Sequence, residues 1–242
     1  MQFSKFTIAV LDNFSVIHPS LIFKKDWIST ISGNSPFAQD DNVFAFYKLP
    51  ENENVFDFPI GIADLRVFLK LIKEFSKCSE WDLEIQENNF LLTSTLGKIK
   101  YYYSNNEIML DCPHNDMITS LPESKVRFIL KQNDLKQVIK FSSILGVSDF
   151  FVVAGKGKVA ARVTNLKDPT SNTYTIKLGD NQINDSENNS EERIKVAFLL
   201  SDLNFFDGDY IVDIAPNQSA KFTHIEYPDL VYIISMQQLE EN

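Results

Sequence analysis

The residue types that most often carry chemistry are few in this chain, and their spacing indicates no reaction centre. The three histidines, His18, His114 and His224, stand apart, without an HExxH pattern or a second ligand at metal-binding spacing. Cys78 and Cys112 are single residues without a CxxC pair, which is typical of a reducing compartment. We therefore expect no catalytic residues, no metal site and no cofactor. An enzyme stays an open alternative only because catalytic groups can come together from distant positions.

The glycines Gly155 and Gly157 are the nearest approach to a phosphate-binding loop. They lack the Gly-Lys-Ser/Thr that completes such a loop, and a strand-like stretch follows them instead. Because strand-like stretches flank them at 150–153 and 159–163, the glycines predict the turn of a tight hairpin.

Basic residues, by contrast, follow a regular pattern on the predicted helix 62–77. At 100° per residue, four of them fall within about 60° of the helix circumference, so they form one positive ridge. These four are Arg66, Lys70, Lys73 and Lys77. Apolar residues occupy most of the remaining circumference, which predicts a helix that is buried on most sides and presents a narrow positive edge.

Two other predicted helices carry weaker versions of this pattern. On the helix 132–145, Lys136 and Lys140 lie one turn apart. On the helix 4–15, Lys5 shares a face with Asp12, so the charge there is mixed.

A solvated helix face is the simplest alternative explanation of the positive ridge. The chain, however, has 23 Lys and Arg against 33 Asp and Glu, a net charge of −10, so an ordinary solvated face should carry acids as well. The ridge therefore predicts a functional surface for a polyanion. Duplex DNA, with about one charge per 1.7 Å of axis, fits such a surface, and lysines that contact its phosphates read no sequence.

The basic helices belong to a unit that recurs along the chain, a short apolar strand followed by an Asp-Leu pair that opens a helix. Three copies place Asp64, Asp134 and Asp202 at intervals of 70 and 68 residues. A divergent fourth copy fits at Phe3-Ser4. We expect each Asp in the first turn of its helix, where the helix dipole favours an acid.

Periodicity and turn signals predict the elements and domains. The predicted helices are 4–15, 62–77, 132–145 and a short one near 201–206. The predicted strands include 81–85, 99–103, 150–153, 159–163, 174–178, 210–214 and 230–234. These elements predict an N-terminal domain at 1–111, a connector with two prolines at 112–124, a C-terminal domain at 125–242, and a polar loop at 179–193. We expect an α+β fold of two similar domains, each with two helices packed on antiparallel sheets.

Composition agrees with a globular chain of this kind. The 242 residues are 44% hydrophobic and include 20 Phe, enough for a sizeable core. The apolar runs fall far short of the roughly 20 residues that cross a bilayer, and the N-terminus lacks the features of a signal peptide. The acidic total predicts that surfaces outside the basic helices repel phosphate.

The order of these units resembles a DNA sliding clamp. The segments FSKFTIAVLDNF, DLRVFLKLIKEF, NDLKQVIKFSSILGV and YTIKLGD are similar to the clamp of T-even-type bacteriophages, and the similarity spreads over most of the chain. The resemblance implies the DNA-clamp fold and a head-to-tail homotrimer, whose six domains close a ring lined by helices. It implies a polymerase processivity factor in DNA replication that encircles duplex DNA without sequence specificity.

The resemblance also implies binding partners, a cellular location and the residues of two sites. They are the replicative DNA polymerase, an ATP-dependent clamp loader complex and late-transcription proteins, in the cytoplasm of the infected bacterial host. The DNA-facing residues would be Lys5, Arg66, Lys70, Lys73, Lys77, Lys136 and Lys140. A partner-peptide pocket would use Leu121, Pro228, Leu230 and Tyr232, although each could equally be an ordinary core or turn residue. The strands 99–103 and 174–178 are the candidates for the subunit seams.

Two alternatives stay open from the sequence. One is a monomeric, non-specific DNA-binding replication accessory protein. The other is a non-enzymatic virion structural protein whose lysine ridge is simply solvated. The mass in solution separates the first from a ring, and loader-dependent polymerase stimulation separates the second.

Overall fold

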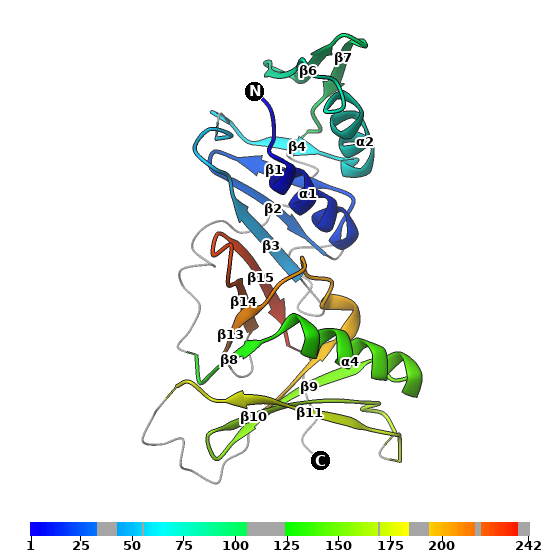
Figure 1. Ribbon diagram of the computed structural model, residues 1–242, viewed down its shortest axis with the longest axis vertical. Helices are drawn as coiled ribbons and strands as arrows, with labels where there is room; N and C mark the ends of the chain where they lie inside the picture. Colours follow the sequence, from blue (N-terminus) through cyan, green and yellow to red (C-terminus); the bar gives the residue numbers. More distant parts are fainter. Residues whose placement is uncertain are drawn as a thin grey trace. The chain divides into compact units, whose positions relative to one another are not determined.

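A computed structural model gives the structure of the chain (Figure 1) and describes residues 1–32, 43–54, 56–105, 124–168, 170–183, 194–215 and 219–236. The chain forms two compact units, one made mainly of the described residues up to 105 and one made mainly of those from 124 onward. Only Ser124 of the predicted connector at 112–124 lies among the described residues, so the predicted domain limits stay a prediction. No described helix is long and apolar enough to span a membrane.

The first unit contains two helices and two antiparallel sheets. The helices are α1 (Lys5–Ile17) and α2 (Leu65–Phe75). The first sheet has the strand order β4-β1-β2-β3 within this unit, and the second has the order β5-β6-β7. The strands are β1 (Leu21–Lys24), β2 (Trp27–Ile31), β3 (Val43–Lys48), β4 (Ile60–Ile62), β5 (Trp81–Ile85), β6 (Asn89–Ser94) and β7 (Gly97–Tyr102).

A cluster of phenylalanines forms the centre of the first unit. Phe23 of β1 stacks on Phe56 with ring centroids 4.6 Å apart, and Phe68 of α2 lies 5.2 Å from Phe90 of β6. All four rings are fully buried. Aromatic burial therefore fixes α2 to both sheets of its unit and leaves its opposite face to solvent.

The second unit repeats the plan with one α-helix among its described residues, α4 (Gln132–Leu145), and a short 3-10 helix, η3 (Leu200–Asp202). One sheet has the strand order β15-β14-β13-β8 within this unit, and the other has the order β11-β10-β9-β12. The strands are β8 (Val126–Leu130), β9 (Asp149–Gly155), β10 (Lys158–Thr164), β11 (Tyr174–Asp180), β12 (Ile194–Leu199), β13 (Tyr210–Ala215), β14 (Ser219–His224) and β15 (Leu230–Ser235).

The helix starts are held by different devices in the different copies of the unit. Ser4 caps α1 by accepting from the Thr7 amide at 3.1 Å, and Asp64 caps α2 by accepting from the Val67 amide at 3.0 Å. Asp64 thus lies one residue before the helix, whereas the sequence had suggested that it lies in the first turn. In α4 the cap position is Lys131, which makes no side-chain cap bond, and Asp134 lies in the first turn as expected.

The predicted hairpin turn between β9 and β10 is confirmed. Lys156 and Gly157 both have positive φ, at 52° and 70°. Two successive residues of this kind form the turn that best suits the twist of a hairpin.

The predicted fourth helix at 201–206 is wrong. The chain forms one 3-10 turn, η3, and then leaves helical geometry. Phe205 packs against two buried rings, with its ring centroid 4.7 Å from that of Phe222 and 4.8 Å from that of Tyr232. The Phe206 amide donates to the Tyr232 hydroxyl at 3.1 Å, and the Tyr210 hydroxyl donates to the Phe206 carbonyl at 2.5 Å. A further helical turn would break both bonds.

Candidate nucleic-acid interface

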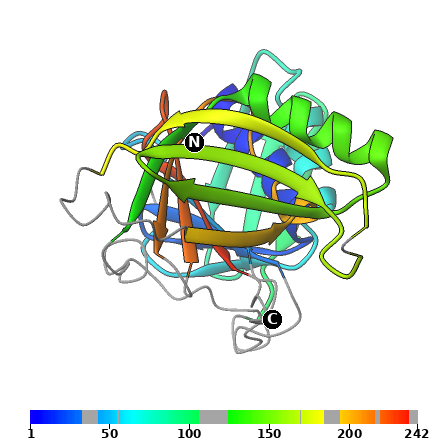
Figure 2. The ribbon, with the colours of Figure 1, turned by 90° about the horizontal axis from the view of Figure 1, so that it is seen from below.

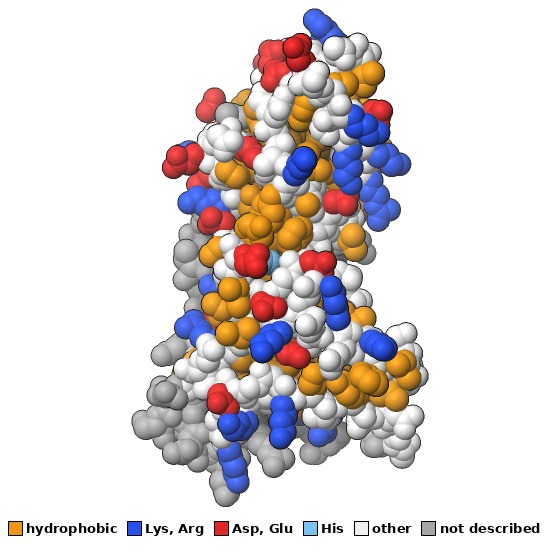
Figure 3. Space-filling model, viewed as in Figure 1, with side chains coloured by type: hydrophobic (Ala, Val, Ile, Leu, Met, Phe, Trp, Pro, Cys, Tyr) orange, Lys and Arg blue, Asp and Glu red, His pale blue; other side chains and the backbone are white. Residues whose placement is uncertain are grey.

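Helix α2 presents its basic residues on the face that does not pack. Its buried side chains, including Phe68 and Ile72, hold the helix against the sheets. The four predicted basic residues are all exposed: Arg66, Lys70, Lys73 and Lys77. Figure 3 shows basic side chains gathered in this region of the first unit.

This basic face is wider and less purely positive than the sequence had suggested. Val67, which the helical projection placed on the packed side, is 44% exposed. Lys77 forms an ion pair with Glu74, with Nζ and Oε2 2.5 Å apart. The prediction of a narrow, purely positive edge is therefore wrong, because the sheets cover only one side of α2.

Helix α1 packs beside α2 and contributes an acid to the basic face. The Asp12 Oδ1 atom lies 2.6 Å from the Lys73 Nζ atom, and both side chains are about half exposed. A groove of about 280 Å³ lies between the helices. Its lining consists of Asp12, Ser15, Arg66, Leu69, Lys70 and Lys73. Asp12 therefore neutralises one cation of a groove that otherwise keeps Arg66 and Lys70 as its charges.

The remaining cation of α1, Lys5, is exposed near the N-terminal end of the helix. The start of α1 is supported from a distant loop, because the Ser4 amide donates to the buried Glu53 carboxylate at 3.0 Å. Lys5 thus lies at a helix end that is fixed in place.

Helix α4 carries the basic residues of the second unit. Lys136 and Lys140 are both exposed, and the Lys136 Nζ atom lies 3.4 Å from Asp207 Oδ1. The helix is held on β11, where the Phe141 ring stacks on Tyr174 at 4.2 Å and the Tyr174 hydroxyl donates to Gln137 at 3.2 Å. The cationic face of α4 is therefore the face directed away from the sheet.

All the predicted DNA-facing residues are thus exposed, in both units, and all lie on helices except Lys77, which is in the turn two residues after the end of α2. If these residues contact DNA, each unit must expose them on helix faces that do not pack against its sheets. Their convergence on a common surface in an assembled particle stays a prediction.

The predicted partner-pocket residues have mixed environments. Pro228 is exposed on the loop before β15, whereas Leu230 and Tyr232 are fully buried in that strand. The Tyr232 hydroxyl is engaged with the Phe206 backbone, and burial raises the pKa of this phenol. Leu121 lies outside the described residues. The pocket stays a prediction, and of its three described residues Pro228 alone is exposed.

The two described histidines have structural roles. His18 ends α1, its Nδ1 atom lies 2.8 Å from the Ser20 hydroxyl, and burial lowers its pKa. His224 is 1% exposed and forms hydrogen bonds to backbone atoms on both sides of its ring. Among the described residues, no group of three His, Cys, Asp or Glu side chains is placed to hold a metal ion. His114 and Cys112 lie outside the described residues.

Comparison with known proteins shows that this chain is similar to sliding clamps. Residues 127–237 match the family described as gp45 sliding clamp, C terminal. The "Sliding clamp" of Vibrio phage KVP40 is 27% identical over 242 residues, covering 99% of this chain and 100% of the relative.

Solved structures share the fold over nearly the whole chain. The β sliding clamp of Caulobacter crescentus is 10% identical with a TM-score of 0.64, covering 96% of this chain and 63% of its own. The β clamp of Helicobacter pylori bound to a DNA ligase peptide is 11% identical with a TM-score of 0.63, covering 97% of this chain and 64% of its own. This chain therefore spans just under two thirds of the length of those β clamps. The C-terminal part of the chain therefore matches the gp45 sliding clamp family, the whole chain is similar to a phage sliding clamp, and its fold is that of the β sliding clamps.

Proposed function

We propose that the chain acts as a ring-shaped trimer that encircles duplex DNA and tethers the replicative polymerase. The observation that carries this proposal is the exposure of cations on the unpacked faces of α2 and α4, one helix in each unit of a sliding-clamp fold. Such helices can contact phosphates of any sequence, because no contact to a base edge is needed. The chain would carry out no reaction itself.

The physical mechanism depends on enclosure, with only weak binding to the DNA. Exposed lysine–phosphate contacts are individually weak and screened by salt, so they exchange rapidly as the duplex moves. A closed ring does not need strong contacts to stay on DNA, and weak contacts permit sliding. A polymerase attached to the ring is kept near the primer end at a high effective concentration.

Trimer closure would use the free edges of two sheets. β7 is a terminal strand of its sheet, and β11 is a terminal strand of another. The opposite edge of the sheet β5-β6-β7, on β5, is already covered, because the Leu83 amide donates to the Met1 carbonyl at 2.9 Å and Gln2 donates to the Trp81 carbonyl. We propose that β7 of one protomer pairs with β11 of the next, head to tail, in agreement with the seam candidates 99–103 and 174–178.

The partners follow from this role. A clamp loader would open the ring, the polymerase would dock through a short peptide near Pro228, and late-transcription proteins would compete for the same ring in the infected bacterial cell. The phage relative supports the setting, and the ligase peptide on the H. pylori clamp supports the peptide mode of docking.

The decisive experiment combines solution mass with polymerase synthesis. Light scattering at micromolar concentration should give the mass of three 27.7 kDa chains. Synthesis on primed circular DNA should become processive only with this protein, a cognate loader and ATP together. A single-chain mass would favour the monomeric accessory protein, and a trimer without any stimulation would favour a structural role.

The Asp12–Lys73 ion pair provides a second test of the DNA-facing groove. Asp12→Asn should strengthen non-specific binding to a short linear duplex a few-fold, because Lys73 becomes available to a phosphate. The slope of log affinity against log salt should steepen by up to about 0.9 for each new phosphate contact. Stability should change by less than about 1 kcal/mol, because the pair is exposed. Fluorescence anisotropy across a salt series measures both quantities.

The matched control is Asp57→Asn, which removes an exposed acid outside the helices with the same change of charge. An equal gain in both variants would mean that net charge alone governs binding, and that Asp12 has no special position.

A further inference from the structure

The sheet β11-β10-β9-β12 has a basic face that the helices do not cover. α4 packs on the other face, where Tyr174 stacks on Phe141 and is paired across the sheet with the buried Val163. Strand alternation places Ala160 and its neighbours across the strands, Val153 and Lys177, on the opposite face. Figure 2 shows the four strands side by side.

Four lysines and one arginine gather on this face and at its hairpin. They are Lys156, Lys158, Arg162, Lys177 and Lys195, which together we call the basic sheet patch. All five are exposed in a chain whose net charge is −10. Figure 3 shows basic side chains along this edge of the second unit. The expectation that surfaces outside the helices would repel phosphate is wrong for this face.

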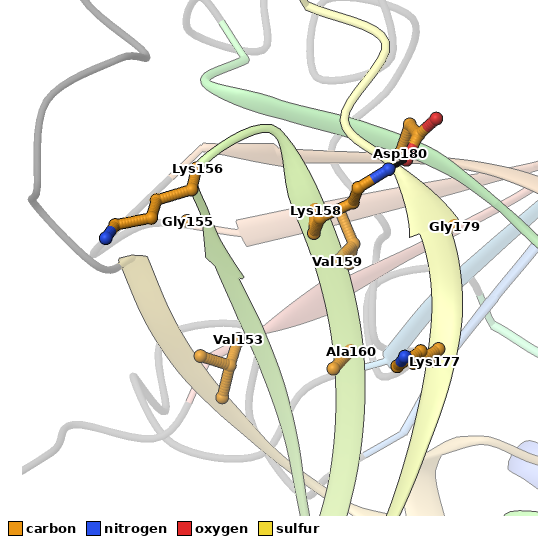
Figure 4. Close-up of a pocket in the computed structure, with 9 residues that line it drawn as sticks. All are labelled: Val153, Gly155, Lys156, Lys158, Val159, Ala160, Lys177, Gly179 and Asp180. Carbon is orange, nitrogen blue, oxygen red and sulfur yellow. Dashed lines mark hydrogen bonds and ion pairs between the residues drawn. The ribbon is translucent and has the colours of Figure 1, made fainter.

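Some cations of the basic sheet patch are not engaged in ion pairs. Lys158 is neutralised by Asp180, with Nζ and Oδ1 2.5 Å apart. Lys156 and Lys177 form no ion pair within the described part of the chain. Figure 4 shows Lys158 reaching toward Asp180 while Lys156 extends to the other side of the hairpin.

Between these lysines the surface is hollowed and apolar at its base. A depression of about 470 Å³ lies over Val153 and Ala160, bordered by Gly155 and Gly179. Because the glycines have no side chain and Ala160 has only a methyl group, the long lysines stand around a hollow. Lys195 adds a cation beside Phe151, with Nζ 4.5 Å from the ring centroid. The Lys158–Asp180 pair also borders the depression, but Lys156 and Lys177 stay without an ion-pair partner in the described part of the chain. An apolar base beside these two cations is complementary to an apolar side chain flanked by carboxylates.

We propose that the basic sheet patch docks a short acidic segment of a partner protein, with one apolar side chain seated over Val153 and Ala160 and carboxylates beside Lys156 and Lys177. The sheet face would be a docking site separate from the predicted pocket near Pro228, which lies on a different sheet. It also leaves the edge of β11 available, because side chains on a sheet face and backbone groups on its edge point in different directions.

The test uses a fluorescein-labelled synthetic peptide of alternating Asp and Glu with one central Phe. Its binding to the full chain is measured by anisotropy at low and moderate salt. The variant Lys156→Asp with Lys177→Glu should weaken binding about tenfold or more, since two attractive contacts become repulsive. Asp is chosen at position 156 because it tolerates the positive φ of the turn.

The control variant is Lys48→Glu with Lys167→Glu, which makes the same change of charge at exposed positions away from the patch. Its binding should change by less than about twofold. Equal weakening in both variants would overturn the proposal in favour of non-specific attraction. Melting curves and light scattering for every variant verify that fold and mass are unchanged.

The apolar anchor is tested separately. A peptide with Gly in place of the central Phe should bind several-fold more weakly, and Ala160→Leu, which fills the depression, should weaken the Phe peptide but not the Gly peptide. Equal binding of the two peptides would refute the anchor.

A third variant carries Gln and Asn in place of the acids in 184–193, the stretch that joins β11 to β12 in the sequence. If the Phe peptide bound only to this variant, the chain's own acidic stretch would be the occupant, and the proposal would fail. Tighter binding of a duplex DNA competitor at the patch would equally reject a peptide as its ligand.

Discussion

Replacing Arg66 and Lys70 with Glu is expected to remove most of the loader-dependent polymerase stimulation on primed circular DNA, while the mass of the protein in solution, which we propose to be that of a trimer, stays unchanged. The two side chains are exposed on α2 and line the groove between α1 and α2. Reversing both charges leaves Asp12 and the new carboxylates facing the phosphates. Each lost phosphate contact flattens the salt dependence of DNA binding by about 0.9 in the log–log slope, so the loss of affinity should be largest at low salt. We expect a loss of about tenfold or more in DNA retention.

Arg66 and Lys70 are better choices than Lys73 and Lys77 for this test. Lys73 is paired with Asp12 and Lys77 with Glu74, so reversing them would also create carboxylate pairs within the protein. The control is again Lys48→Glu with Lys167→Glu, which has the same net charge. If both variants synthesised DNA equally well, the assignment of α2 to the DNA would be wrong. A fall in mass would instead indicate damage to the subunit seam.

The sequence predicted the α-helices well because their signals are local. The apolar period of α2 and α4 and the start signals Ser4 and Asp64 lie within the helices or one residue before them. The start of α4, in contrast, depends on a contact that local sequence signals do not reveal. Its first amide, of Gln132, donates to Asp209 at 2.8 Å, a residue 77 positions away. A cap supplied from that distance is visible only once β8 and β13 are paired.

The same distinction applies to the functional surfaces. The exposed cations of α2 and α4 could be found from a helical projection, because burial of one helix face leaves the other exposed. The ion pair between Asp12 and Lys73 could not, since it depends on how α1 and α2 pack. The basic sheet patch has a partial signal in the alternation of Lys158, Ala160 and Arg162 along β10. Its assembly required the register with β9 and β11, including the irregularity between Val159 and Ala160.

The copy of the repeated unit at Asp202 and Leu203 does not form the predicted α-helix. The cause again involves residues that are distant in the sequence. The Asp-Leu pair is present at Asp202 and Leu203, but Phe205, which follows it, packs against the buried rings of Phe222 and Tyr232. The chain then turns at Asp207 and Gly208 to enter β13. Gly208 has a φ of 151°, and a Cβ atom built on it would lie 2.0 Å from His224 Nε2. The local pattern for a helix is therefore overridden by a tight contact between the turn and β14.

Gly208→Ala should consequently be among the most destabilising single substitutions in the chain. His224 cannot easily move aside, because its ring is buried, its Nε2 atom lies 3.1 Å from the Asp207 carbonyl and its Nδ1 atom accepts from the Glu226 and Tyr227 amides at 3.1 Å. Overpacking costs about 1–3 kcal/mol, and an unfavourable backbone conformation costs about 1–3 kcal/mol. We expect the free energy of unfolding to fall by about 3 kcal/mol or more, measured by urea denaturation.

Gly97→Ala is the matched control, because Gly97 also has a positive φ, 133°, but no atom lies within 4 Å of its added Cβ. It should carry only the backbone cost, so the difference between the two variants isolates the contact with His224. The double variant Gly208→Ala with His224→Ala should be less destabilised than the sum of its single variants, since the clash is lost with the ring. If Gly208→Ala were no worse than Gly97→Ala, the turn could relax, and tight packing against β14 could not explain why the fourth helix stops after η3.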